Sequence, residues 1–162
     1  MDFEKRLEQA IDRGERNRDA HDRAALEKTL SEEELRNLHS SIRLNLTEQI
    51  EAGLRKLSDH FPGFRFETVV EENGWGAKIS RDDLAFGRKS GRSSEFSLLQ
   101  FLVRPFSPKA KIVEIIGKGT IRNKEVLSRS HFQFLNEANE AGLIDVLELW
   151  LLEFAEKFAS TK

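Results

Sequence analysis

Glu114 is the carboxylate most suggestive of chemistry in this sequence, because it interrupts the otherwise apolar run from Ile112 to Ile116. A carboxyl group buried without a partner has a raised pKa, which is how many proteins make a catalytic acid. If the turn after Arg104 sets an even strand register, Glu114 lies opposite Gln100 and on the same face as Arg104. Gln100, Arg104 and Glu114 are therefore candidate ligand-binding residues, with an ion pair between Glu114 and Arg104 or a lysine as the structural alternative.

The segment from Gly87 to Ser93 superficially resembles a phosphate-binding loop, but its spacing is wrong. Only three residues separate its two glycines, and Arg92 stands where the phosphate-loop pattern requires Lys. No helix signal follows, so no helix N-terminus is available to hold phosphates. Arg88, Lys89 and Arg92 remain candidates for binding a polyanion such as RNA or DNA, although a solvated hairpin loop is the interpretation that we favour.

Metal, cofactor and nucleophile sites are not predicted. The chain has no Cys, which excludes disulfides, thiolate zinc sites and thiol nucleophiles. No two of its histidines have metal-ligand spacing, and no Gly-x-Ser-x-Gly elbow occurs. We therefore predict no catalytic residue, no metal and no cofactor. The four histidines are His21, His39, His60 and His131.

The net charge of −2 hides a segregation of charge along the chain. Residues 1–60 carry a net charge of −3, residues 61–135 of +5 and residues 136–162 of −4. Acidic helices that neutralise a basic sheet region explain this pattern without any outside partner. The alternative is nucleic-acid or polyanion binding through the basic region 88–129.

Residues 1–30 predict a polar helical arm. Phe3, Leu7 and Ile11 begin an apolar stripe that fades after Ile11, so the segment is either a solvated helix or a mobile arm. Ser31 and Glu34 then form a capping box, which predicts the start of a new helix. We expect residues 31–162 to form a single α+β domain.

The rest of the chain alternates between helix and strand patterns. Leucines and isoleucines recur at three and four residue spacing from Leu35 to Phe61, which predicts a long amphipathic helix. Asn73-Gly74 predicts a hairpin turn in which Glu72 pairs with Trp75. Both faces of the strands 96–103 and 112–116 are apolar, so we expect helices to cover the sheet on both sides. A last helix is predicted from about Asn139 to Phe158.

Together these patterns predict an α+β fold with two N-terminal helices, a five or six stranded mostly antiparallel meander sheet covered by helices, and a C-terminal core helix. No run approaches the 18 apolar residues of a membrane span, and no secretory signal is visible, so we expect a cytoplasmic location without membrane contact. The expected function is a non-catalytic binding module or adaptor that binds a protein partner or self-associates. The alternatives are the polyanion binder and a small-ligand protein or enzyme with a polar pocket around Glu114.

Overall fold

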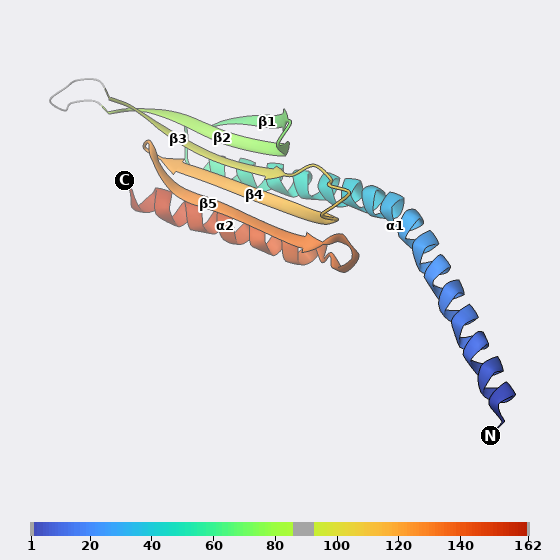
Figure 1. The fold of residues 1–162 in the computed structure, drawn as a ribbon. Coiled ribbons are helices and arrows are strands. Elements are labelled where there is room, and N and C mark those ends of the chain that lie inside the picture. The colour runs from blue at the N-terminus through green and yellow to red at the C-terminus, as the bar shows by residue number, and fades with distance from the viewer. Residues whose placement is uncertain (1, 86–92, 162) are drawn as a thin grey trace. The chain divides into compact units, whose positions relative to one another are not determined.

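The computed structural model describes residues 2–85 and 93–161, without the side chains of residues 22–31, 83–85 and 93–94. The predicted α+β fold class is confirmed, since one antiparallel sheet lies between an N-terminal and a C-terminal helix in the sequence (Figure 1). The elements are α1 (Phe3–His60), β1 (Arg65–Glu71), β2 (Gly74–Ala85), β3 (Ser93–Val103), β4 (Ile112–Ile121), β5 (Lys124–Phe134), the 3₁₀ turn η1 (Leu135–Glu137) and α2 (Glu140–Ser160).

Helix α1 runs without interruption through Ser31, where the sequence predicts that a second helix starts. Neither Gly nor Pro occurs between residues 15 and 52, so the backbone chemistry imposes no break at a capping residue. The chain nevertheless forms two compact units, Met1–Asn37 and Leu38–Lys162.

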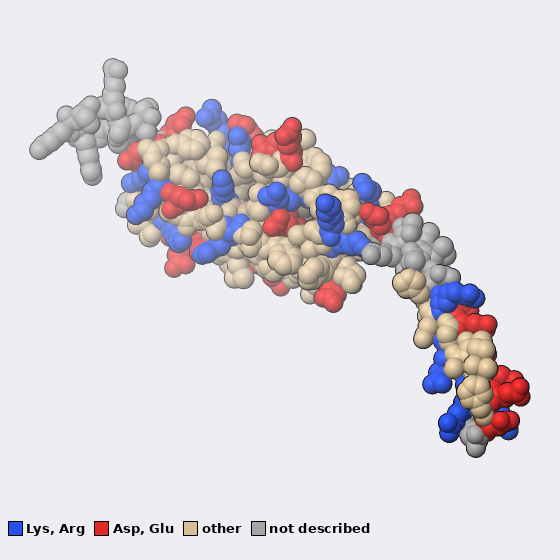
Figure 2. Space-filling model, in the orientation of Figure 1, with Lys and Arg blue, Asp and Glu red and all other residues tan. Residues whose placement is uncertain are grey.

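The first unit is a single helix, and the side chains of residues 2–21 within it are all exposed. Phe3, Leu7 and Ile11 have 74%, 46% and 52% of their surface exposed to solvent. Figure 2 shows the uncharged surface of this segment as a stripe, with basic side chains on one side and acidic side chains on the other. The helix is thus amphipathic, but no described residue covers its apolar stripe.

The sheet is a meander in which consecutive strands pair antiparallel, in the order β1-β2-β3-β4-β5. In the first hairpin Glu71 pairs with Gly74 and Val70 with Trp75, so the register is shifted by two residues from the expected one. Gly74 lies at the start of β2, where a Cβ atom would collide with the carbonyl oxygen of Val103. This glycine is required for a close approach between strands and is not a central residue of the turn.

The two helices of the second unit cover the same face of the sheet. The guanidinium of Arg55 on α1 lies 3.9 Å from the ring centre of Phe66, and Trp150 on α2 packs against Phe101 with ring centres 6.1 Å apart. The strand pairing places Phe66 and Phe101 on one face. The core lies between this face and the helices, and its fully buried members include Leu46, Ile50, Leu54, Leu99, Ile115, Phe154.

The expectation that helices cover both faces of the central strands is wrong. On the other face Phe96, Phe132 and Phe134 have 39%, 50% and 52% of their surface exposed. Residues 38–60 of α1 and all of α2 each have one wide apolar stripe, and both stripes are used on a single face. The second unit is therefore a two-layer structure with one open sheet face.

Candidate functional site

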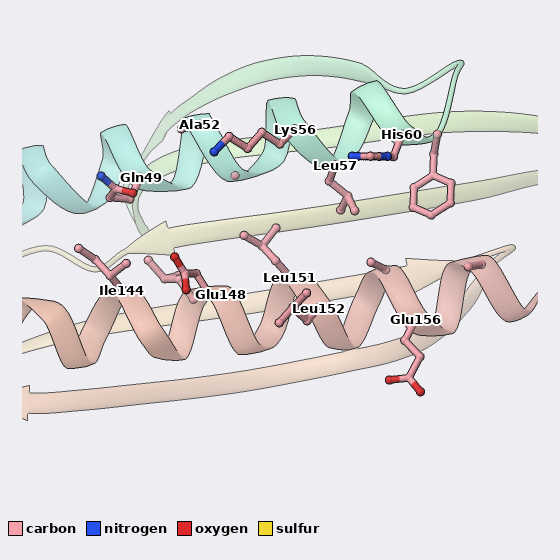
Figure 3. Close-up of a pocket in the computed structure, with 15 residues that line it drawn as sticks. Gln49, Ala52, Lys56, Leu57, His60, Ile144, Glu148, Leu151, Leu152 and Glu156 are labelled. Carbon is pink, nitrogen blue, oxygen red and sulfur yellow. The ribbon is translucent and has the colours of Figure 1, made fainter.

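A groove of about 820 Å³ lies between α1 and α2 (Figure 3). The two helices run parallel along it, because Gly53 lies beside Leu151 and, further along both helices, Phe61 packs against Phe158 with ring centres 4.8 Å apart. Figure 3 shows Leu57 and Leu151 pointing toward one another from opposite walls. The apolar lining residues are Leu57, Phe61, Ile144, Leu147, Leu151, Leu152.

Small residues keep the groove open. Ala52, Gly53, Ala155 and Ala159 all line it, and their short side chains leave the space that leucines would fill. A Cβ atom at Gly53 would meet the Cδ1 methyl group at the end of the Leu151 side chain, which would have to shift to accept a larger residue here. The result is an open apolar surface along two helices instead of a packed helix–helix seam.

Leu152 marks the rim of this groove. It has 66% of its surface exposed and lines the groove, whereas Leu149, one turn earlier on α2, is 63% exposed but does not line it. Fully burying a leucine side chain stabilises a protein or complex by about 1.5 to 3 kcal/mol. A partner that covers Leu152 would recover much of this free energy.

The two walls of the groove carry opposite charges. The α1 wall contributes Lys56 and His60, and the α2 wall contributes Glu148 and Glu156. All four residues are exposed. Within the described part of the chain, Lys56, Glu148 and Glu156 form no ion pair, so their charges are available to a bound molecule.

The structure brings together two of the three residues proposed for a polar pocket. Arg104 Nε lies 3.2 Å from Glu114 Oε1, and the Arg104 amide donates a 2.9 Å hydrogen bond to the Glu114 carbonyl oxygen. Gln100 pairs with Lys118 instead of Glu114, because Val103 pairs with Ile115 and the register is shifted by four residues from the expected one. Gln100 is therefore about 13 Å from the ion pair along the strand.

The face of Glu114 is confirmed, but its expected burial with Gln100 is not observed. The Glu114 side chain is 27% exposed and is neutralised by Arg104, which is the arrangement expected of a structural ion pair. The groove lies on the opposite side of the sheet from this pair. A ligand-binding role for Gln100, Arg104 and Glu114 stays a prediction, as does polyanion binding by Arg88, Lys89 and Arg92, which lie outside the described residues.

His39 is the one histidine with a buried side chain among the described residues, with 3% of its surface exposed. Its Nε2 atom lies 3.1 Å from the Arg104 carbonyl oxygen, and its ring meets the ring of Phe106 edge to face. Burial lowers the pKa of His39, and the charge of Arg43 lowers it further, although the hydrogen bond to Arg104 opposes this. His39 thus joins α1 to the loop between β3 and β4 as a neutral ring.

The groove could not be identified from the sequence as a site, because its walls come from two helices about a hundred residues apart. The available signals were the small residues Gly53 and Ala155 within apolar helices and the extra leucines on α2. In the described ranges, residues 2–85 and 93–161, we find no group of three or more potential metal ligands. No helix described here combines the length and the apolarity that crossing a membrane requires.

Comparison of the chain with protein-family models, with curated proteins and with solved structures finds no match. Its function must therefore be inferred from the geometry and charge of its own residues.

Proposed function

We propose that the protein is a binding module that holds an amphipathic α-helix of a protein partner in the groove between α1 and α2. The observation that carries this proposal is the open apolar groove itself, with Leu152 exposed at its rim. Exposed apolar surface bordered by charged residues is typical of protein interaction sites. Laying an apolar helix face into such a groove is a recurring way of binding a peptide.

The shape of the groove favours a helix over a compact small molecule. Its α1 wall extends from Gln49 to His60, which corresponds to about 16 Å at 1.5 Å per residue, or about three helical turns. A third helix can pack in the groove between two parallel helices that have small residues along it, at the usual interaxial distance of about 8 to 10 Å.

The charges of the rim specify the partner further. Lys56 and His60 on one wall favour an acidic flank on the bound helix, and Glu148 and Glu156 on the other wall favour a basic flank. A helix with these flanks exchanged would place like charges together on both sides, which lowers affinity and provides specificity.

A designed peptide tests this function. The probe is a fluorescein-labelled amphipathic helix of about four turns, with a leucine stripe, glutamates on one flank and arginines on the other. Fluorescence anisotropy with the full-length protein should show saturable binding. Leu152→Asp should weaken binding at least about tenfold, because it places a charge on the apolar contact surface, whereas Leu149→Asp should change it less than about twofold.

A second peptide with the two flanks exchanged serves as the control for charge. It should bind more weakly at low salt, and the difference should shrink as salt screens the rim. Absence of saturable peptide binding, or equal losses from Leu152→Asp and Leu149→Asp, would contradict the proposal. Saturable binding of a fluorescent fatty acid, without any binding of the peptide, would indicate a small-ligand function instead.

A further inference from the structure

We infer that the helix which occupies the groove is the N-terminal segment of α1, residues 3–14, from a second copy of this chain. This inference rests on the proposed function and names its partner. Three features of the segment carry it, namely its exposed apolar stripe, its length and the charges on its two flanks.

The apolar stripe has the spacing that a groove-binding helix requires. Phe3, Leu7 and Ile11 recur every four residues and lie on one helix face, together with Ala10 and Gly14. The three large residues are 46% to 74% exposed. From Phe3 to Gly14 the stripe is about 16 Å long at 1.5 Å per residue, which matches the α1 wall of the groove from Gln49 to His60.

The charges of the segment are sorted by flank. At 100° per residue, Glu4 and Glu8 fall on one side of the stripe, and Arg6 and Arg13 fall on the other. This separation is visible in Figure 2 as basic and acidic surfaces on either side of the uncharged stripe. Within the described residues, none of these four side chains forms an ion pair.

The sorted charges also select one orientation. Figure 3 shows α1 above α2, with both helices running from left to right. In a right-handed helix that runs in the same direction, successive residues rotate from the top, through the side that faces the viewer, to the bottom. A third helix laid parallel to them with its stripe against the groove turns its glutamate flank toward α1 and its arginine flank toward α2. Glu4 and Glu8 then face the wall of Lys56, and Arg6 and Arg13 face the wall of Glu148. An antiparallel helix would reverse these contacts.

The occupant comes from a second copy because residues 3–14 and the wall residues 49–60 belong to one helix, α1. A helix cannot pack along itself, so intramolecular docking would require α1 to break. Because the segment docks parallel to the α1 wall of the next copy, each copy uses its segment and its groove with different neighbours, and the copies associate head to tail.

Sedimentation velocity of the full-length chain tests the inference. The native protein should show dimers and longer oligomers that dissociate on dilution. Leu7→Asp in the segment and Leu152→Asp in the groove should each weaken self-association at least about tenfold. The matched controls are Lys5→Gln, which makes the same change of charge as Leu7→Asp on the opposite helix face, and Leu149→Asp. Both should associate as the native protein does.

Mixing the two defective variants separates docking of the segment in the groove from other modes of association. The Leu7→Asp chain keeps an intact groove and the Leu152→Asp chain keeps an intact segment, so their mixture should form a heterodimer through one arm and one groove. Each variant alone should be monomeric, and circular dichroism should show that both are folded.

A native protein that is monomeric at high micromolar concentration, or a mixture that stays monomeric, would overturn the inference. So would self-association that tolerates Leu7→Asp. In each of these cases the designed peptide still reports on the groove: if the peptide binds and Leu152→Asp abolishes binding, the proposed function holds and only this occupant is wrong. If the peptide does not bind either, both proposals fail.

Discussion

Two stretches of α1 carry apolar stripes of similar spacing, but only one of them is buried by the chain described here. Leu46, Ile50 and Leu54 in the second stretch have no exposed surface, whereas Phe3 and Leu7 in the first remain largely exposed. The periodicity is a local property of the sequence, while burial depends on what the rest of the fold places against it. An amphipathic pattern therefore predicts which face is covered but not which molecule covers it.

The largest difference between the two stretches should appear in their contributions to stability. Leu54→Ala should lower the free energy of unfolding by about 2 to 5 kcal/mol, because it removes buried methyl groups and leaves a cavity. Leu7→Ala should change it by no more than about 0.5 kcal/mol at concentrations where the chain is monomeric. Urea denaturation followed by circular dichroism measures both. Equal losses would mean that the first stretch packs in the same cooperative core.

The acid sensitivity of His39 gives a second, smaller test of burial. Since burial lowers the pKa of His39, the unfolded chain takes up a proton at a higher pH than the folded chain does. Burial of the neutral ring therefore contributes fully to the free energy of unfolding above the ordinary histidine pKa of about 6.5. This contribution decreases as the pH falls from about 6.5 toward the lowered pKa of the folded protein.

His39→Gln should therefore make the urea midpoint less sensitive to pH between about pH 7 and about pH 5.5. The other histidines are the same in both proteins, so the difference between the two pH profiles isolates His39. Parallel pH profiles of the native protein and His39→Gln would show that the folded protein accommodates the charged ring of His39.

The smallest effect is expected on the open face of the sheet. Arg104 and Glu114 form a partly exposed ion pair, with side chains 46% and 27% exposed. Glu114→Gln should cost less than about 1 kcal/mol of stability, as is usual for pairs that water and salt screen. A loss several times larger would show that the carboxylate is more tightly enclosed, and would favour the predicted polar site around it.

Local sequence patterns predicted most helices and strands of the fold. The strand register and the helix packing depend on contacts between residues far apart in the sequence and were predicted less accurately. The alternation in β1 and β2 placed Phe66 and Ala77 on one face, as observed. The pairing itself is shifted by two residues, because Gly74 is part of β2, where it allows close approach to Val103, and is not a residue of the turn. A shift by two leaves the faces unchanged, so Ala77 and Ile79 are buried as expected, although Val70 on the same face is 77% exposed.

The candidate site was harder to predict than the elements. The even register after Arg104 correctly placed Glu114 on its face, but the pairing of β3 with β4 is shifted by four residues from the expected one, so Gln100 pairs with Lys118. The groove depends on how α1 and α2 sit beside one another on the sheet, and no local pattern encodes that packing. The apolar stripe from Phe3 to Ile11 was visible in the sequence, but the surface that matches it was not.

The claim that a second copy fills the groove can be tested most directly by disulfide trapping, since the native chain has no cysteine. Chains with a single cysteine in the segment, Phe3→Cys, Leu7→Cys or Ile11→Cys, are each mixed with Leu152→Cys chains under mild oxidation, and the products are separated without reductant. A disulfide requires Cα atoms within about 7 Å, so a covalent heterodimer reports direct proximity. We expect at least one segment position to cross-link to Leu152→Cys and none to the equally exposed Leu149→Cys. No cross-link to Leu152→Cys from any of the three positions, or equal yields at both leucine positions, would contradict the account.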